Sequence, residues 1–354
     1  MERAISNKLT IILGAGASHD CGDRNTAAQI NEAYRPPLAK GIFAQQFDAI
    51  LNRYPVLTAR LDELRTKLSK GGNFEEIFRG LLESAERHRN FWPLQLPLYL
   101  RELFWTISED YLQGSSKFDT LVRRVLESPF EEVMFVNLNY DLFLEDALTN
   151  YDRHEFSALS SYVPVSKKWR YVKPHGSVNW ARILENCPSD GTGAFLPSRL
   201  QEMPTFSSEL RLVMWNRHSH GFYIPGGGPP GYLYPQVVVP TDRSKSFVCP
   251  KDHIDQAQAF IQSCQHFLII GFSGRDDDVI GLMKGIPSHS RLAIISKGDA
   301  RAISARVRTA ITHSKYKKVL LSSHDIGFSK FVTDRSFDAF LETECFPKAR
   351  TRQF

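Results

Sequence analysis

The stretch that decides the fold covers residues 9–22 and reads Leu-Thr-Ile-Ile-Leu-Gly-Ala-Gly-Ala-Ser-His-Asp-Cys-Gly. Its first part is apolar and β-branched, which is typical of a buried strand, and it stops at the small residues 14–18. A strand that ends in small residues before a helix brings backbone N–H groups close to a phosphate, and the helix dipole adds to the attraction. Glycine after a strand is also ordinary turn chemistry, so both interpretations stay open on this stretch alone.

Length and composition are typical of a globular protein. The chain has 354 residues, of which 42% are apolar and 12% aromatic. That is enough for one large domain or two ordinary ones. The apolar runs are too short to span a bilayer, and the first residues lack the apolar core of a signal peptide. We therefore expect a cytoplasmic protein without a membrane contact.

The net charge is +5, and positive side chains gather in two places. One is the segment 297–318, and the other is a basic tail over residues 346–354. Such runs attract nucleic acid, nucleotides or acidic partners, but a solvated helix face is the simpler interpretation. Direct contact with nucleic acid is therefore a secondary expectation.

The cysteines are scattered, and no two form a Cys-x-x-Cys pair. They are Cys21, Cys187, Cys249, Cys264 and Cys345. A structural zinc site of four cysteines normally uses such pairs, so we expect no zinc and no other metal. An odd number of cysteines in a cytoplasmic chain predicts buried or free thiols rather than disulfides.

Apolar periodicity divides the chain into a sheet domain and a helical insertion. Residues 1–34 and 128–345 are predicted to form a Rossmann-like α/β domain, and residues 35–127 an all-helical insertion subdomain. The alternation of strands and helices in the last third predicts a parallel sheet with helices on both faces. Residues 186–235 are predicted to be irregular, which favours a loop over a site and also fits a surface excursion.

The expected elements follow from the same periodicity. Expected helices cover residues 26–33, 74–82 with Asn73 as N-cap, 96–112, 118–126, 142–148, 254–264, 278–283, 301–312 and 331–341. Expected strands cover residues 9–13, 132–137, 169–172, 237–239, 267–270, 291–295 and 319–321.

Four expected strands end in small or polar clusters. These clusters are residues 14–18, 139–141, 175–177 and 271–276. In an open parallel sheet, ligands bind beyond the carboxyl ends of the strands, and these ends share one edge. The four clusters together therefore predict one site at that edge.

Three side chains in these clusters suit cleavage of a glycosidic bond. Asn139 can hold a ribose hydroxyl or a water in a fixed orientation. Asp141 is a short carboxylate near a helix start, where a role as N-cap is an equally good explanation. His175 belongs to the residue type whose ordinary pKa is near neutrality, so it is suited to act as a general base.

Two common nucleotide-binding motifs fit less well. The dinucleotide fingerprint Gly-x-Gly-x-x-Gly needs glycine where this chain has His19, and no clear acidic residue follows at the expected distance. A Walker A loop is excluded because the chain has no Gly-Lys-Ser or Gly-Lys-Thr. A dehydrogenase is therefore disfavoured, and a P-loop NTPase is excluded.

The order of the motifs resembles that of the sirtuin superfamily. Its three signature motifs resemble Gly-Ala-Gly-Ala-Ser at 14–18, Asn-Tyr-Asp at 139–141 and His-Gly-Ser at 175–177, and Gly-Phe-Ser-Gly-Arg-Asp at 271–276 looks like its later glycine-serine turn. The chain looks more similar to the bacterial sirtuin-like NAD hydrolases of anti-phage defence systems. That resemblance adds Arg-Pro-Pro-Leu at 35–38 and Phe-Glu-Glu at 74–76.

The resemblance implies a role for each site residue. Gly14, Ala15, Gly16 and Ser18 would line the NAD diphosphate. Asn139 and Asp141 would lie beside the nicotinamide ribose, and His175 would be the general base. The other cofactor-binding residues would be Gly271, Ser273, Asp276 and Ser296, with Ser273 at a phosphate or ribose and Ser296 facing the adenosine.

The activity implied by the resemblance is hydrolysis of NAD, the substrate, to nicotinamide and ADP-ribose. Sirtuin deacylases carry a four-cysteine zinc module and a Pro-Asp-Phe-Arg segment after the first motif. This chain has no such cysteine module, and His-Asp-Cys-Gly stands at residues 19–22. A deacylase is therefore the less favoured alternative. A catalytically weak NAD-binding or ADP-ribose-binding sensor or scaffold is the other.

The resemblance also implies a cellular role and partners. The relatives deplete NAD in abortive infection and are held inactive until infection. We therefore expect a homo-oligomer or a complex with a regulatory protein, which would be Argonaute-like, a hexameric ATPase or a nucleotide-processing protein. The helical insertion and the basic C-terminal region are the candidate contacts. The trigger, the preference for NAD or NADP, and hydrolysis against cyclisation stay open.

Overall fold

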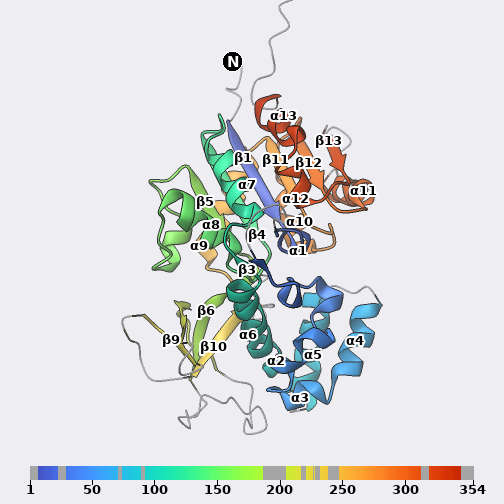
Figure 1. Cartoon of the computed structure of the whole chain (residues 1–354), viewed down its shortest axis with the longest axis vertical. Helices are drawn as coiled ribbons and strands as arrows, with labels where there is room; N and C mark the ends of the chain where they lie inside the picture. Colours follow the sequence, from blue (N-terminus) through green and yellow to red (C-terminus); the bar gives the residue numbers. More distant parts are fainter. Residues whose placement is uncertain are drawn as a thin grey trace, which may run out of the picture.

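A six-stranded parallel sheet organises the upper part of the molecule in Figure 1. The computed structural model describes residues 7–22, 29–70, 74–88, 92–185, 205–216, 221–225, 227, 232–237, 247–311 and 319–343. The strand order is β13-β12-β11-β1-β4-β5, and all neighbouring strands run parallel. The bounds are β1 Lys8–Leu13, β4 Glu132–Asn137, β5 Trp169–Val172, β11 His266–Ile270, β12 Arg291–Ile295 and β13 Leu320–His324.

The inner strands are continuous apolar runs because both of their faces are covered. In β1, residues 9–13 are all buried, and β11 is buried along its whole length. Strands of this kind belong to sheets with helices on both faces. The predicted fold class, an α/β Rossmann-like parallel sheet, is confirmed.

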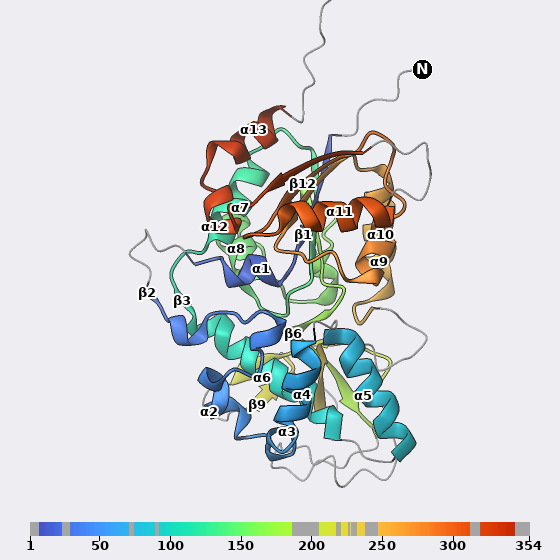
Figure 2. The same cartoon turned by 90° about the vertical axis from the view of Figure 1, so that its right-hand side faces the viewer.

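Helices form a layer on each face of the sheet (Figure 2). On one face α9 (Lys251–Ser263), α10 (Asp277–Met283) and α11 (Ala300–Ile311) pack together. On the other lie α7 (Lys117–Leu126), α8 (Phe143–Asp152), α12 (Phe328–Phe331) and α13 (Arg335–Thr343). There Phe118 packs on Phe328 with ring centroids 5.1 Å apart, which joins α7 to α12.

Helices and a small antiparallel sheet form the lower part of the molecule in Figure 1. The antiparallel sheet has the order β10-β6-β7, and a separate hairpin joins β8 to β9. The strand bounds are β6 Gly176–Leu184, β7 Arg211–Leu212, β8 Met214–Asn216, β9 Gly221–Tyr223 and β10 Tyr232–Val237. The helix bounds are η1 Glu32–Tyr34, η2 Ala39–Gly41, η3 Gln45–Phe47, α2 Asp48–Leu51, α3 Pro55–Thr58, α4 Leu61–Ser69, α5 Phe74–His88, η4 Trp92–Leu94 and α6 Gln95–Asp110.

Helix α6 joins this helical part to the antiparallel sheet. The Arg101 guanidinium donates to the Leu233 carbonyl at 2.9 Å, and the Tyr234 hydroxyl donates to the Leu94 carbonyl at 3.0 Å. Both bonds connect α6 or the turn before it with β10. The lower part is therefore one packed unit rather than a helical unit beside a loose loop.

The helix predicted over residues 26–33 is wrong where the structure describes it. Gln29–Ile30 forms the strand β2, which pairs with β3, Leu112–Gln113. The 3-10 helix η1 follows, and the Asn31 side chain accepts from the Ala33 N–H. Strand β3 lies inside the insertion predicted to be all-helical, residues 35–127, so this prediction is also wrong at residues 112–113. In both places tertiary pairing overrides local helix propensity.

Two further predictions need correction. The segment predicted to be irregular, 186–235, contains β7, β8, β9 and the beginning of β10. Val237, the one described residue of the strand predicted at 237–239, belongs to β10 and pairs antiparallel with Gly176 of β6, so it does not join the parallel sheet. These strands are difficult to recognise in the sequence for two reasons. Glycine and proline are typical of turns, and period-2 alternation is weak in segments of two to six residues.

The remaining differences concern boundaries. The helix predicted over 331–341 is split into α12 and α13. Asn73 and the basic tail lie outside the described residues. The division of the chain at residues 35 and 127 stays a prediction, and α7, which falls inside that range, packs on α8. Within the described residues, no helix is long and apolar enough to cross a membrane.

The loops after β1 and β11 contact each other through their backbones. The Gly14 N–H donates to the Ile270 carbonyl at 2.9 Å, and the Gly16 N–H donates to the Gly271 carbonyl at 3.0 Å. Gly271 has φ +64, and a Cβ there would lie 2.2 Å from the Ala17 nitrogen. A Cβ on Gly14 would lie 2.6 Å from the Gly271 oxygen. The short helix α1, Ala15–His19, begins directly after this contact.

Replacing Gly271 tests this backbone contact. We expect Gly271→Ala to lower the free energy of unfolding by at least ~2 kcal/mol, because it adds a steric clash to an unfavourable positive φ. Urea unfolding followed by circular dichroism measures the change. Gly281→Ala is the matched control, because Gly281 lies in α10 with nothing within 4 Å of an added Cβ. Equal stability of both variants would contradict the contact.

Candidate active site

The polar clusters follow four neighbouring strands of the parallel sheet. In the sheet order β11-β1-β4-β5, they are residues 271–276, 14–18, 139–141 and 173–177. Because these strands are parallel, their carboxyl ends meet at one edge. One detail differs from the prediction, since Gly176 and Ser177 begin β6 rather than end a parallel strand.

Asn139 joins the end of β4 to the loop after β1. Its side-chain nitrogen donates to the Gly14 carbonyl at 3.2 Å and to the Ser18 hydroxyl at 2.8 Å. Its backbone N–H donates to Asn137 Oδ1 at 3.1 Å. Because a carbonyl only accepts, the Gly14 contact sets the orientation of the amide. Asn139 Oδ1 is therefore the atom with which this side chain can orient a hydroxyl or a water.

Asp141 is a buried carboxylate with 1% exposure. In the described part of the chain neither carboxylate oxygen meets hydrogen-bond geometry, although the Ser18 hydroxyl is close enough to lower the pKa. Burial is the stronger effect and raises the pKa of Asp141 to about 6, while the Lys173 ammonium acts in the opposite direction. The N-cap of α8 is Leu142, not Asp141. A buried carboxylate that lacks well-formed hydrogen bonds is unfavourable, which makes Asp141 a candidate functional residue.

Lys173 is fully buried and connects the end of β5 with the start of α8. Its ammonium donates to the Asp141 carbonyl at 2.6 Å, to Glu145 Oε1 at 2.9 Å and to the Ser177 hydroxyl at 2.8 Å. The opposite charges of Lys173 and Glu145 compensate each other at this depth. These bonds hold the backbone of Asp141 while leaving its carboxylate oxygens unpaired.

A second set of bonds extends from Glu145 back to β4. Glu145 Oε2 accepts from the Tyr171 hydroxyl at 2.8 Å, and that hydroxyl accepts from Asn137 Nδ2 at 2.9 Å. The network thus reaches the residue that holds the Asn139 backbone. Lys173 and Glu145 are not among the residues predicted from the sequence, because these residue types are almost always exposed unless they are paired. The available signal was the position of Lys173 directly after a buried strand and next to the 175–177 motif.

His175 lies in the connection from β5 to β6 and pairs with Asp276. His175 Nε2 is 2.8 Å from Asp276 Oδ2, with side-chain exposures of 10% and 13%. Burial acts to raise the pKa of Asp276, but the bond and charge of His175 and the α10 backbone N–H groups outweigh it, so this pKa lies below its ordinary value. The motif resemblance assigned Asp276 to NAD, whereas the geometry pairs it with His175.

Gly176 fixes the backbone next to His175. It has φ +83, and a Cβ there would lie 1.9 Å from the Gln236 carbonyl oxygen on β10. Only glycine allows this approach of β6 to β10. The position of His175 therefore depends on the antiparallel sheet as well as on the parallel one.

The other predicted cofactor residues lie at the same edge with different contacts. Gly14 and Gly16 use their N–H groups in the contact with the β11 loop, while Ala15 is exposed. The Ser273 carbonyl accepts from Arg306 of α11 at 2.9 Å. Ser296 bonds through its backbone to the β13 side, where its N–H donates to the His324 carbonyl at 3.1 Å. In the described ranges, no hydrogen bond connects Ser273 or Ser296 to Asn139 or Asp141.

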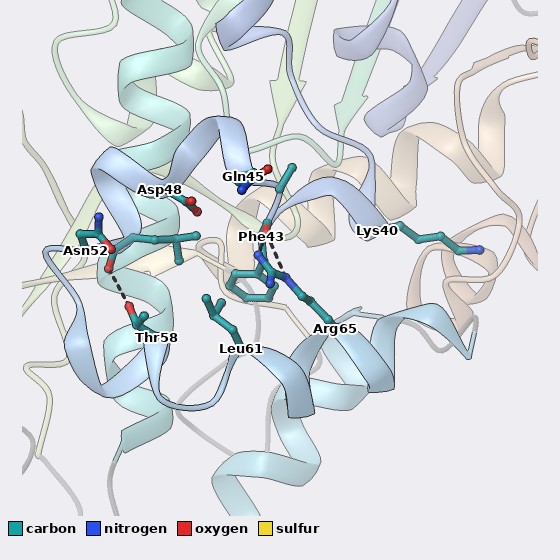
Figure 3. A pocket seen from close by; sticks show the side chains of 10 residues that line it. Lys40, Phe43, Gln45, Asp48, Asn52, Thr58, Leu61 and Arg65 are labelled. Atoms are coloured by element: carbon teal, nitrogen blue, oxygen red, sulfur yellow. Dashed lines mark hydrogen bonds between the residues drawn. The ribbon is translucent and has the colours of Figure 1, made fainter.

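A pocket of about 610 Å³ lies in the helical part, separate from the strand ends (Figure 3). Its lining includes Lys40, Phe43, Asp48, Leu61 and Arg65. The Arg65 guanidinium donates to the Phe43 carbonyl at 2.7 Å. None of the residues predicted for the site lines this pocket.

Comparison with known proteins finds a distant structural similarity. No family model matches the chain, and no curated protein matches it. A structure of Sir2Tm bound to a propionylated peptide is 13% identical with a TM-score of 0.36, and the match covers 94% of this chain and 93% of that chain. A Sir2 homolog–NAD complex is 12% identical with a TM-score of 0.38, covering 96% of this chain and 91% of that chain. These low TM-scores mean that the molecules superpose loosely.

The titration of Asp141 gives a stability prediction. Because its pKa rises from an ordinary 3.8 to about 6 in the folded protein, the folded state keeps this proton to higher pH than the unfolded state does. The resulting stability is present at low pH and is lost as pH rises through 6. Relative to Asp141→Asn, we expect the wild-type free energy of unfolding to fall by about 2.5 kcal/mol between pH 4 and pH 8.

Urea unfolding of both proteins across this pH range measures the difference. Asp277→Asn is the control, because Asp277 is exposed on α10 and its curve should follow that of the wild type. Parallel curves for wild type and Asp141→Asn would show that the buried carboxyl does not titrate as expected.

Proposed function

We propose that this protein hydrolyses NAD at the nicotinamide–ribose bond. The observation that carries the proposal is the Asp141 carboxylate, which is 1% exposed and whose oxygens meet full hydrogen-bond geometry with none of the described residues. When the bond between ribose C1′ and the nicotinamide nitrogen breaks, the electron pair goes to nicotinamide and positive charge develops on the ribose. A buried anion stabilises such an oxocarbenium-like state more strongly than it would in water.

Water completes the proposed reaction. Its oxygen attacks C1′ and its proton leaves, so NAD and water give nicotinamide, ADP-ribose and one proton. Asn139 Oδ1 is suited to orient that water or a ribose hydroxyl, because both amide N–H groups are already used. His175 accepts the proton directly or through a ribose hydroxyl. A positioned base of this kind contributes about 10²–10⁴ in rate.

The rest of the proposed NAD site follows from the motif resemblance. Its members are Gly14, Ala15, Gly16, Ser18, Gly271, Ser273 and Ser296, which occupy loops at the same edge of the sheet. The diphosphate would lie over the loop after β1. Asn139 connects this loop to the reacting end of the site through its bonds to Gly14 and Ser18.

The cellular role that we propose is NAD depletion in anti-phage defence, and its support is the resemblance of the motifs. An enzyme of this kind would need restraint before infection, through self-association or a separate regulatory protein. Expression with the neighbouring genes in infected bacteria, with cellular NAD measured in wild-type and His175→Ala strains, tests the role. Unchanged NAD in the wild-type strain after infection would contradict it.

Substitution of the polar residues tests the activity. We expect His175→Ala to lower kcat for nicotinamide release by about 10²–10⁴, because the base is lost. Asn139→Ala should lower kcat by a similar factor, because the attacking water loses its acceptor. Purified protein is incubated with NAD, with and without an acyl-lysine peptide, and nicotinamide, ADP-ribose and acyl-ADP-ribose are measured.

His289→Asn is the matched control, because His289 is exposed, has φ 68, and lies in the turn between α10 and β12. Asparagine tolerates this backbone conformation, so the variant should keep full activity. Full activity of His175→Ala and Asn139→Ala would contradict the assignment. NAD binding without turnover would favour a binding module, and acyl-peptide-dependent release would favour a deacylase.

A further inference from the structure

The contact between His175 and Asp276 joins two loops that follow different strands. Nε2 of the ring and Oδ2 of the carboxylate are 2.8 Å apart, and both side chains are largely buried. At this distance one proton lies between the two atoms. Because an ionised carboxylate can only accept, the ring must carry a hydrogen on Nε2.

The position of Asp276 is itself fixed. It is the N-cap of α10, and its Oδ1 accepts from the Val279 N–H at 2.9 Å. The loop before it is held by Arg306, which donates twice to the Ser273 carbonyl, at 3.1 and 2.9 Å. The start of α10 therefore fixes the carboxylate of Asp276, and Oδ2 can hold the imidazole with little freedom.

We propose that Asp276 is a positioning residue for His175. It holds the imidazole in the Nε2–H form, in which Nδ1 is the basic nitrogen of the ring. This differs from the contact with NAD that the motif resemblance implies for Asp276. The catalytic part of the inference rests on the proposed NAD hydrolysis. The part that concerns the imidazole does not, because it follows from the donor and acceptor roles in the folded protein.

The carboxylate of Asp276 caps α10 and contacts the His175 ring, and Asp276→Asn separates these two roles. Asparagine is as good an N-cap as aspartate, so its oxygen can still accept from the Val279 N–H. Its NH₂ group then faces His175 Nε2, which must accept and therefore loses its hydrogen to Nδ1. The reversed amide would direct its NH₂ at the Val279 N–H, so two donors would meet. The variant thus keeps the start of α10 and moves the ring hydrogen of His175 from Nε2 to Nδ1.

Long-range ¹H–¹⁵N correlation spectra of histidine-labelled protein report the position of the ring hydrogen. The His175 signal is assigned by its absence in His175→Gln. We expect the Nε2–H form in the wild type and the Nδ1–H form in Asp276→Asn. With NAD, Asp276→Asn should lower kcat at least ~10²-fold and change KM less than about threefold.

Asp278→Asn is the matched control. Asp278 lies on the same helix and its nearest ion-pair partner is Arg79, with Nη2 and Oδ2 3.9 Å apart. The substitution removes a negative charge near His175 but leaves the contact between Asp276 and Nε2 in place. The position of the ring hydrogen and kcat should therefore stay as in the wild type. Thermal unfolding checks that all variants are folded.

The outcomes distinguish this inference from the proposed function. An Nδ1–H form in the wild type, or an unchanged ring form in Asp276→Asn, overturns the role of Asp276. A raised KM with unchanged kcat in Asp276→Asn also overturns it, in favour of a contact with NAD. If the wild type releases no nicotinamide but the ring hydrogen moves to Nδ1 in Asp276→Asn, the proposed function fails while the assignment of the imidazole form stands.

Discussion

The backbone contact between the loops after β1 and β11 is the constraint on which the site depends. At Gly14, Gly16 and Gly271 the backbones of these two loops approach each other at distances that any Cβ would prevent. This packing fixes the position of the Gly14 carbonyl, which accepts a hydrogen bond from the Asn139 side chain. The orientation of the Asn139 amide is therefore a consequence of the glycine contact. These glycines therefore act first on the geometry of the protein, and any contact with a diphosphate would come in addition.

Charge is distributed unevenly around the site. Lys173 and Glu145 are buried but fully paired, and their bonds extend to Tyr171 and Ser177. Asp141, held through its backbone by the same lysine, keeps its carboxylate unpaired and its pKa raised to about 6. The paired charges thus order the backbone at Asp141, while its carboxylate takes no part in their hydrogen bonds.

The lower part of the molecule is coupled to the site in two places. His175 stands directly before β6, whose first residue, Gly176, packs against β10, and β10 is bonded to α6. Arg79 of α5 also lies near Asp278 on the helix that begins at Asp276. An exposed pair of this kind contributes ~0–1 kcal/mol, so it can be broken by a modest change in packing. A movement of the helical part would therefore act on both members of the His175–Asp276 pair.

The sequence by itself determined the parallel strands, their apolar character and the clusters at their ends, because apolar periodicity and glycine turns are local properties of the chain. The motif order also indicated Asn139, Asp141 and His175. Only the tertiary structure decided which residues meet. The connections after β5 and β11 meet although β1 and β4 lie between these strands in the sheet, and this brings His175 to Asp276. Lys173 and Glu145 can be buried because they form an ion pair, and the sequence does not show that pairing. The strands β2, β3, β7 and β10 exist through pairing with segments that are distant in the sequence, and the energy of that pairing is not visible in any local stretch.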